Sequence, residues 1–192
     1  MQQNTSAQIA RKTRWHRKWH RNIAIIGAAF LLFTSVTGLL LAWKKNSGGY
    51  LLAESKKGSS PLLSQWLSFE TLSSKAITAL REKHGNTIDT VISRIDARPD
   101  KGMVKFIFEN HYHALQVDAV TGNILLYEER RADFIEQLHD GSIIDKLLSA
   151  NGLGKLTYST IGGISLLLLT ITGFWLWYNP KRIRKRKAEI QP

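Results

Sequence analysis

Two long runs of uncharged, mostly apolar residues constrain this chain more than any other feature. The first covers residues 23–43 and the second residues 156–178. At about 1.5 Å per residue, each run as a helix is long enough to cross a hydrocarbon core of about 30 Å. A cleaved signal peptide has a shorter apolar region that ends in small residues, whereas the first run ends in Ala42-Trp43-Lys44-Lys45. The sequence therefore predicts two transmembrane helices.

The net charge of +12 is concentrated in the two tails of the chain. Residues 1–22 hold six Lys and Arg and no acid, and residues 179–192 hold six against Glu189. Basic residues accumulate on the cytoplasmic side of membrane helices. We therefore expect both tails in the cytoplasm and residues 44–155 on the periplasmic side of an inner membrane. The tails are expected to contact the lipid bilayer and not nucleic acid.

The two apolar runs also resemble each other. The sequence Leu-Leu-Phe-Thr-Ser-Val-Thr-Gly ends at Gly38, and Leu-Leu-Leu-Thr-Ile-Thr-Gly ends at Gly173. Glycine lets another helix approach closely, and threonine hydroxyls can bond to the preceding turn. We interpret both motifs as helix-packing positions, within one chain or in a homodimer with four helices.

The segment between the runs predicts a small α+β domain. Residues 44–60 read as a linker, and residues 131–155 as a helical connection to the second run. In the domain itself, residues 61–130, helical spacing over 69–84 ends at Gly85, which can take the left-handed conformation. Alternating apolar residues predict four short antiparallel strands at residues 87–98, 103–109, 112–118 and 123–128. The fold class expected is a membrane protein with one helix packed on this sheet.

The strand and turn at Gln116-Val117-Asp118-Ala119-Val120-Thr121-Gly122-Asn123-Ile124-Leu125 resemble a PepSY domain, whose hallmark is a strand ending in Asp-x-x-Thr-Gly. Three further stretches resemble PepSY-associated transmembrane proteins: Trp19-His20-Arg21 with the apolar residues up to Thr37-Gly38, Leu138–Ser142, and Phe174–Tyr178. The resemblance covers about residues 14–187. Larger relatives, including ferric-siderophore reductases, have more spans and more histidines, so this chain resembles a reduced two-span version.

Three of the six histidines are candidate haem ligands. His16 and His20 are four residues apart and share a helix face at the cytoplasmic end of the first run. The resemblance implies that His20 is an axial ligand of haem b, with His16 beside it. The alternative is that both belong to an amphipathic collar at headgroup depth. His139 is the third candidate, and its alternative is a helix-terminal histidine capped by Gly141 and held by Asp140.

Geometry restricts how haem could bind. His20 and His139 are expected at opposite faces of the membrane, about 30 Å apart, so they cannot ligate one iron. Each would pair with its counterpart in a second copy of the chain. His111 and His113 are expected at the surface, and no third metal ligand is evident near them. The chain has no cysteine, no phosphate-binding loop and no nucleophile elbow.

Four basic residues lie around the first predicted hairpin: Arg94, Arg98, Lys101 and Lys105. We expect solvated cross-strand pairs there. The alternative is a patch that binds an anionic ferric chelate.

Two classes of function therefore stay open. In the first, the protein is a haem-dependent membrane component of ferric-siderophore reduction or uptake, with a periplasmic ferric chelate as electron acceptor. In the second, it is a membrane-anchored binding module that contacts a protease or another periplasmic protein without catalysis. PepSY domains elsewhere are associated with peptidase inhibition, which supports the second class by resemblance.

Overall fold

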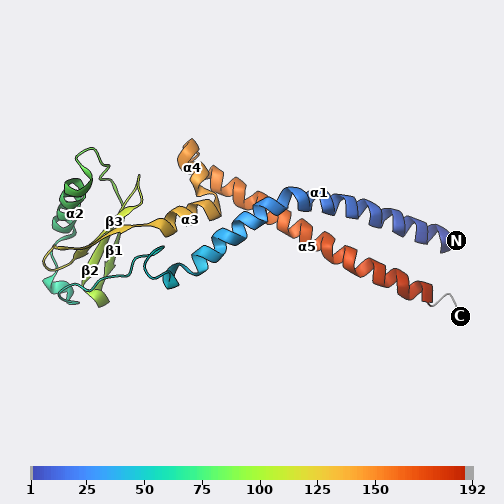
Figure 1. Ribbon diagram of the computed structural model, residues 1–192, viewed down its shortest axis with the longest axis horizontal. Coiled ribbons are helices and arrows are strands. Elements are labelled where there is room, and N and C mark those ends of the chain that lie inside the picture. Colours follow the sequence, from blue (N-terminus) through green and yellow to red (C-terminus); the bar gives the residue numbers. More distant parts are fainter. Residues whose placement is uncertain (1, 189–192) are drawn as a thin grey trace. The chain divides into compact units, whose positions relative to one another are not determined.

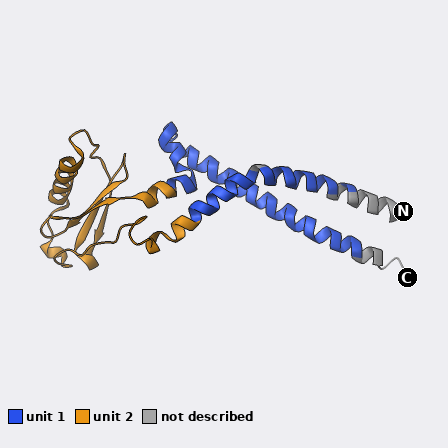
Figure 2. Cartoon of the chain, viewed as in Figure 1, with its two compact units in different colours: residues 1–38, 137–192 blue, residues 39–136 orange. Residues whose placement is uncertain are grey.

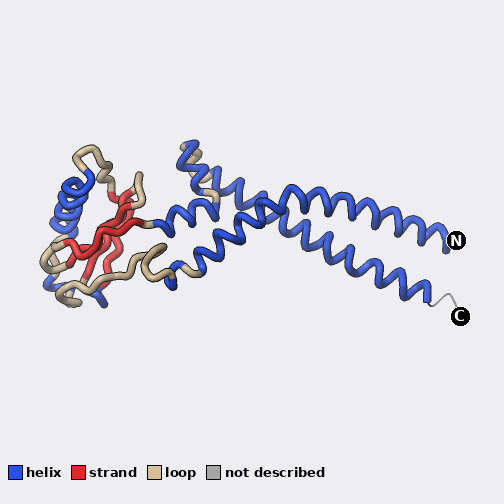
Figure 3. The backbone as a smooth tube through the Cα atoms, viewed as in Figure 1, coloured by secondary structure: helices blue, strands red, loops and turns tan. Residues whose placement is uncertain are grey.

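The computed structural model describes residues 2–188 (Figure 1). The chain divides into two compact units, one of residues 1–38 with 137–192 and one of residues 39–136 (Figure 2). Five α-helices and four strands are described, together with short 3-10 turns (Figure 3): α1 Gln2–Ala42, α2 Phe69–His84, β1 Ile92–Arg98, β2 Met103–Phe108, β3 His113–Asp118, β4 Ile124–Glu129, α3 Arg131–Asp140, α4 Ser142–Leu148 and α5 Leu153–Ala188.

The first unit is built on α1 and α5, which run antiparallel. Side chains that come later on α5 contact residues that come earlier on α1: Tyr158 lies against Phe30, and Trp175 against His16. Gly162 allows the close approach of α5 to α1, since a Cβ at Gly162 would lie 2.6 Å from the Phe30 ring.

Helices α5 and α1 differ in how well they meet the requirements of a membrane span. Among the described residues one helix, Leu153–Arg184 of α5, is long and apolar enough to cross a membrane. In α1, two segments, Arg14–Ile25 and Gly27–Ala42, meet at an angle of 47° and qualify only if taken together as one bent span. The membrane helix predicted over the second apolar run is thus found, and the two-span topology stays a prediction.

The second unit holds the predicted helix-on-sheet domain, which is confirmed. The strands follow the order β1-β2-β3-β4, all antiparallel. Helix α2 begins where Ser68 accepts a hydrogen bond from the Thr71 amide at 3.1 Å, and it ends at Gly85 with φ +90°. The first strand begins at Ile92 and not at residue 87, because the Asp89 carboxylate takes the Val91 amide at 2.9 Å before the ladder starts.

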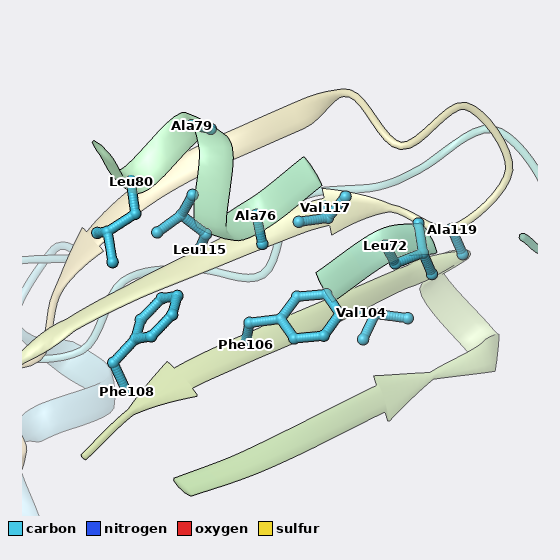
Figure 4. Packing of buried hydrophobic residues seen from close by; sticks show 10 residues of the cluster. All are labelled: Leu72, Ala76, Ala79, Leu80, Val104, Phe106, Phe108, Leu115, Val117 and Ala119. Atoms are coloured by element: carbon cyan, nitrogen blue, oxygen red, sulfur yellow. The ribbon is translucent and has the colours of Figure 1, made fainter. Parts of the chain in front are cut away.

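The core lies between α2 and one face of the sheet. Figure 4 shows the helix residues pointing toward the aromatic side chains of β2. Alternation puts every second residue of β2 and β3 on this face. The buried set comprises Leu72, Ala76, Ala79, Leu80, Val104, Phe106, Phe108, Leu115, Val117 and Ala119.

The opposite face of the sheet is also buried, and a polar cluster lies there among the apolar residues Met103, Ile107 and Ala114. Lys105 and Glu128 form an ion pair at 2.6 Å with side chains 6% and 0% exposed. Gln116 donates to Glu128 and to the Glu54 carbonyl, and accepts from the Lys56 amide at 2.8 Å. Lys105 is therefore not the solvated residue that the sequence pattern predicts, because the segment before the domain lies across this face.

The Asp-x-x-Thr-Gly motif is a turn held by one carboxylate. Asp118 accepts from the backbone amides of Val120 and Thr121, and from the amide and hydroxyl of Ser59. Burial alone would raise the pKa of Asp118, but the Ser59 hydroxyl and these amides outweigh it and lower the pKa. Gly122 takes φ +73°, which lets the chain turn into β4.

Candidate functional site

Two histidine–threonine pairs stand out in the unit that contains α1 and α5. Nδ1 of His20 on α1 lies 2.7 Å from Oγ1 of Thr172 on α5. Nδ1 of His139 on α3 lies 2.9 Å from Oγ1 of Thr37 on α1. His20 and Thr37 are seventeen residues apart on α1, which corresponds to about 25 Å along a helix axis. The two pairs are therefore separate sites toward the two ends of the helix pair.

Each threonine is followed by a glycine that lies against the imidazole ring. A Cβ at Gly173 would lie 3.5 Å from Cε1 of His20, which is an ordinary contact. A Cβ at Gly38 would lie 3.3 Å from Cε1 of His139, which is tighter than an ordinary contact. In both Thr-Gly motifs the threonine hydroxyl thus contacts a histidine, and at Gly38 the missing side chain also leaves room for the ring.

The hydroxyl protons of both threonines are already used within their own helices. Thr37 donates to the Phe33 carbonyl at 2.9 Å, and Thr172 donates to the Leu168 carbonyl at 2.5 Å. A hydroxyl has one proton, so each oxygen is left to accept from the imidazole. We infer that Nδ1 carries a proton in both histidines, and in the neutral form of such an imidazole the lone pair lies on Nε2.

The two Nε2 atoms have no partner in the part of the chain that the structure describes, since neither makes a hydrogen bond or an ion pair there. A neutral imidazole with Nδ1–H donated to a fixed acceptor is the usual arrangement of a histidine that ligates a metal through Nε2. His20 and His139 thus present an oriented nitrogen donor each.

His16 differs from His20, although both lie on the same face of α1. Its ring packs against Trp175 with centroids 4.2 Å apart, and against Trp15 at 5.0 Å. No threonine hydroxyl among the described residues holds its ring nitrogens. His16 therefore takes part in an aromatic contact between α1 and α5, and its place in a collar at headgroup depth stays a prediction.

The end of the helix pair at His139 has a defined turn. Gly141 takes φ +79° directly after α3, and a Cβ there would overlap the Tyr158 ring. The Asp140 carboxylate lies 2.6 Å from Lys155 and accepts from the Ser142 amide at 2.9 Å. Burial opposes ionisation of Asp140, but Lys155 and Ser142 outweigh it and lower its pKa. Asp140 thus binds Lys155 and the turn, while Thr37 holds His139.

Three other histidines gather in the second unit. His84 at the end of α2 stacks on His113 at 4.3 Å, and His111 lies 5.0 Å from His113. Burial, followed by the nearby His84 and His111, lowers the pKa of His113. His84 and His113 border a cavity of about 350 Å³. Within the described residues no group of three or more His, Cys, Asp or Glu is arranged to hold a metal ion.

Sequence reasoning named the histidines but missed their threonine partners. The signal in the sequence that could have indicated these partners is the Thr-Gly motif, which recurs at corresponding places in the two apolar runs. Two histidines, His20 and His139, lie outside these runs. The pairings themselves join residues 152 and 102 positions apart, which no local pattern specifies.

A family model described as the PepSY-associated TM region matches residues 17–190, a stretch that includes both histidine–threonine pairs. No curated protein and no solved structure matches the chain. The expected relation to ferric-siderophore reductases stays a prediction.

Proposed function

The chain belongs to the PepSY-associated TM region family, and we propose that it is a two-span inner-membrane protein that binds haem b at His20 and His139. The observation that carries the proposal is the pair of imidazoles whose Nδ1 atoms lie 2.7 and 2.9 Å from threonine hydroxyls. Both hydroxyl protons are committed to backbone carbonyls, so a lone pair on Nε2 is available for iron.

The proposed topology places residues 23–43 and 156–178 in the bilayer. The basic residues at both ends of the chain support cytoplasmic tails, and residues 44–155 are then periplasmic. In this arrangement His20 lies toward the cytoplasmic leaflet and His139 toward the periplasmic leaflet.

The residues present fit a haem at each end. The donor is a neutral imidazole nitrogen, the ring is oriented by a hydroxyl, and Gly38 and Gly173 keep its neighbourhood free of side chains. A bound haem would supply a one-electron carrier. The protein's own contribution would be to hold each nitrogen donor rigidly and to surround it with apolar side chains.

A second axial ligand for each haem has to come from another molecule in this proposal, because the two histidines are too far apart to share an iron. We propose a homodimer in which His20 pairs with His20 of the second copy, and His139 with His139. Two haems per dimer, one near each leaflet, would form a route for electrons from a donor outside this chain to a periplasmic ferric chelate.

The test uses the full chain purified in detergent after expression with a haem supply. We expect a Soret band, with one haem per chain. His20→Ala and His139→Ala should each remove about half of it, and the double variant nearly all. His84→Ala is the matched control in the other unit and should change nothing. A protein without a Soret band, or one whose band survives in the double variant, would refute the proposal.

His16→Ala separates the two candidates on the same helix face. Because the His16 ring contacts Trp175 and no hydroxyl, we expect this variant to keep its haem. Loss of haem in His16→Ala together with retention in His20→Ala would assign the ligand to His16 and refute the tautomer argument at His20.

The second candidate function, a binding module without haem, is favoured by one observation in the domain. The cavity of about 350 Å³ is lined by Lys83, His84, His113, Tyr127 and Glu129 among others, and is large enough for a peptide side chain or a small ligand. A stoichiometric periplasmic partner that copurifies with haem-free protein would support this function over the first.

A further inference from the structure

We propose that the first turns of α1 carry a binding surface for the phosphate groups of anionic phospholipids. The surface, called here the cationic stripe, consists of the exposed side chains of Arg11, Arg14, Arg17, Lys18 and Arg21. The proposal does not depend on haem, and it is tested with the haem-free protein.

The five side chains lie on one side of the helix. At about 100° per residue, they fall within an arc of about 120°. The centre of this arc is about 140° away from the direction shared by His16 and His20. Charges that serve only to orient a helix in the membrane need no particular side, because orientation depends on their number near the span. Five of the six basic residues in this part of α1 share one side, while Lys12 falls outside the arc, and this bias indicates a surface that contacts a ligand.

The stripe has no acidic partner in the part of the chain that the structure describes. None of its five residues forms an ion pair among the residues that the structure describes. The opposite side of the same turns is occupied, since His16 packs on Trp175 and His20 binds Thr172. Helix α5 therefore covers the histidine side and leaves the cationic stripe exposed.

More cations come from α5 at the same end of this unit. The contact between His16 and Trp175 places the start of α1 beside the end of α5, where Lys181, Arg182 and Arg184 are exposed. Lys181 lies over the Trp177 ring at 3.6 Å. Its stem thus follows an aromatic surface, as expected of a lysine at a membrane interface.

The position of the stripe favours a lipid over an acidic protein or RNA as its occupant. Trp15 and Trp19 flank the stripe and are 57% and 49% exposed, and exposed tryptophans are typical of headgroup depth. The helix then continues directly into the apolar run. The 47° angle between Arg14–Ile25 and Gly27–Ala42 lets the first segment incline toward the bilayer surface while the second crosses it.

Lipid on the stripe would also act on His20, which lies on the other side of the same turns. Phosphates bound to Arg14, Arg17 and Arg21 would hold Arg14–Ile25 in place and so keep His20 against Thr172. We therefore expect anionic lipid to slow hydrogen exchange of the amides in residues 14–25, and to leave residues 131–140 of α3 unchanged.

The binding test titrates the full chain in detergent with fluorescent phosphatidylglycerol and follows anisotropy. Phosphatidylcholine is the neutral comparison. Removing a surface charge weakens attraction to anionic lipid by about fivefold per basic residue at low salt. The variant Arg11→Gln, Arg14→Gln, Lys18→Gln, Arg21→Gln should therefore bind phosphatidylglycerol at least tenfold more weakly. Binding to the wild type should weaken as NaCl is raised.

The matched control is Lys45→Gln, Lys56→Gln, Lys57→Gln, Arg81→Gln, which removes the same charge from exposed positions elsewhere. It should bind like the wild type. Equal affinity for the two lipids, equal loss in the control, or displacement of phosphatidylglycerol by single-stranded RNA would each overturn the proposal. If the four-residue variant loses helical structure, as shown by far-UV circular dichroism, the double variant Arg14→Gln, Arg21→Gln takes its place. We still expect this double variant to bind phosphatidylglycerol about tenfold or more weakly than the wild type.

Discussion

The threonine hydroxyls set the histidine tautomer, and replacing Thr37 by valine tests this directly. Valine has nearly the shape of threonine but lacks the oxygen that lies 2.9 Å from Nδ1 of His139. Thr37 is buried, with 5% of its surface exposed, so little water can replace the lost acceptor. The Nδ1–H is left without a partner, at a cost of about 1–3 kcal/mol.

That cost translates into a measurable loss of ligation. An imidazole without its hydrogen-bonded partner can rotate or change tautomer, and loss of such a partner typically weakens metal binding by about 10–100-fold. We expect Thr37→Val to lower the affinity of the His139 site for haem by this factor, and Thr172→Val to do the same at His20. Thr37→Ser keeps the hydroxyl and should bind within about threefold of the wild type, a difference of under about 0.7 kcal/mol.

The assay is a haem titration of the haem-free full chain in detergent, followed at the Soret band and repeated in the His20→Ala background so that only the His139 site is read. Thr34→Val is the control, because Thr34 lies one turn earlier and bonds only to the carbonyls of Phe30 and Leu31. Thr170→Val serves the same purpose on α5, where the hydroxyl donates to Leu166. If Thr34→Val and Thr37→Val weaken haem binding equally, the hydroxyl contributes through helix packing and the tautomer argument is wrong.

Three predictions concern the domain, each read by unfolding in denaturant. Asp118→Asn should destabilise the domain by about 1–3 kcal/mol at pH 7. Folding lowers the pKa of Asp118, so the stability that its carboxylate contributes is lost as the pH falls below the ordinary carboxyl pKa of 3.8. The difference in stability between variant and wild type should therefore vanish at low pH. Lys105→Met should lower the free energy of unfolding by about 3–5 kcal/mol, because it leaves the buried Glu128 carboxylate unpaired. Adding Glu128→Leu should recover most of this stability. A double variant as unstable as Lys105→Met would contradict the importance of the ion pair. Folding also lowers the pKa of His113, so the unfolded chain binds more protons than the folded one. The free energy of unfolding should therefore fall as the pH drops below about 6.5. A His113→Gln variant whose stability depends on pH in the same way would contradict this.

Local signals in the sequence were sufficient for the helix and the strands of the domain. The bounds predicted for α2, residues 69–84, agree with the structure because a capping serine precedes the helix and a glycine follows it. Alternation placed Val104, Phe106 and Phe108 on the core face because a strand has a strict period of two.

The same alternation failed on the other face of the sheet. It shows that Lys105 points away from the core, but it cannot show that residues 54–56 lie across that face and exclude water. The partners of His20 and His139 were out of reach for a related reason. A hydrogen bond between residues more than a hundred positions apart produces no periodic pattern in the sequence. The repeated Thr-Gly motif was therefore interpreted as a helix-packing motif only.

The span of 152 residues between His20 and Thr172 has a consequence for how the protein is made. At a synthesis rate of about 5–20 residues per second, Thr172 is added about 8–30 s after His20. The domain, whose strands pair with their neighbours in sequence, is complete well before then. His20 on the first helix is therefore without its Thr172 partner while the domain folds. A chain that ends at residue 150 and is released from the ribosome is expected to carry a protease-resistant domain, and an unfolded domain in it would contradict this order.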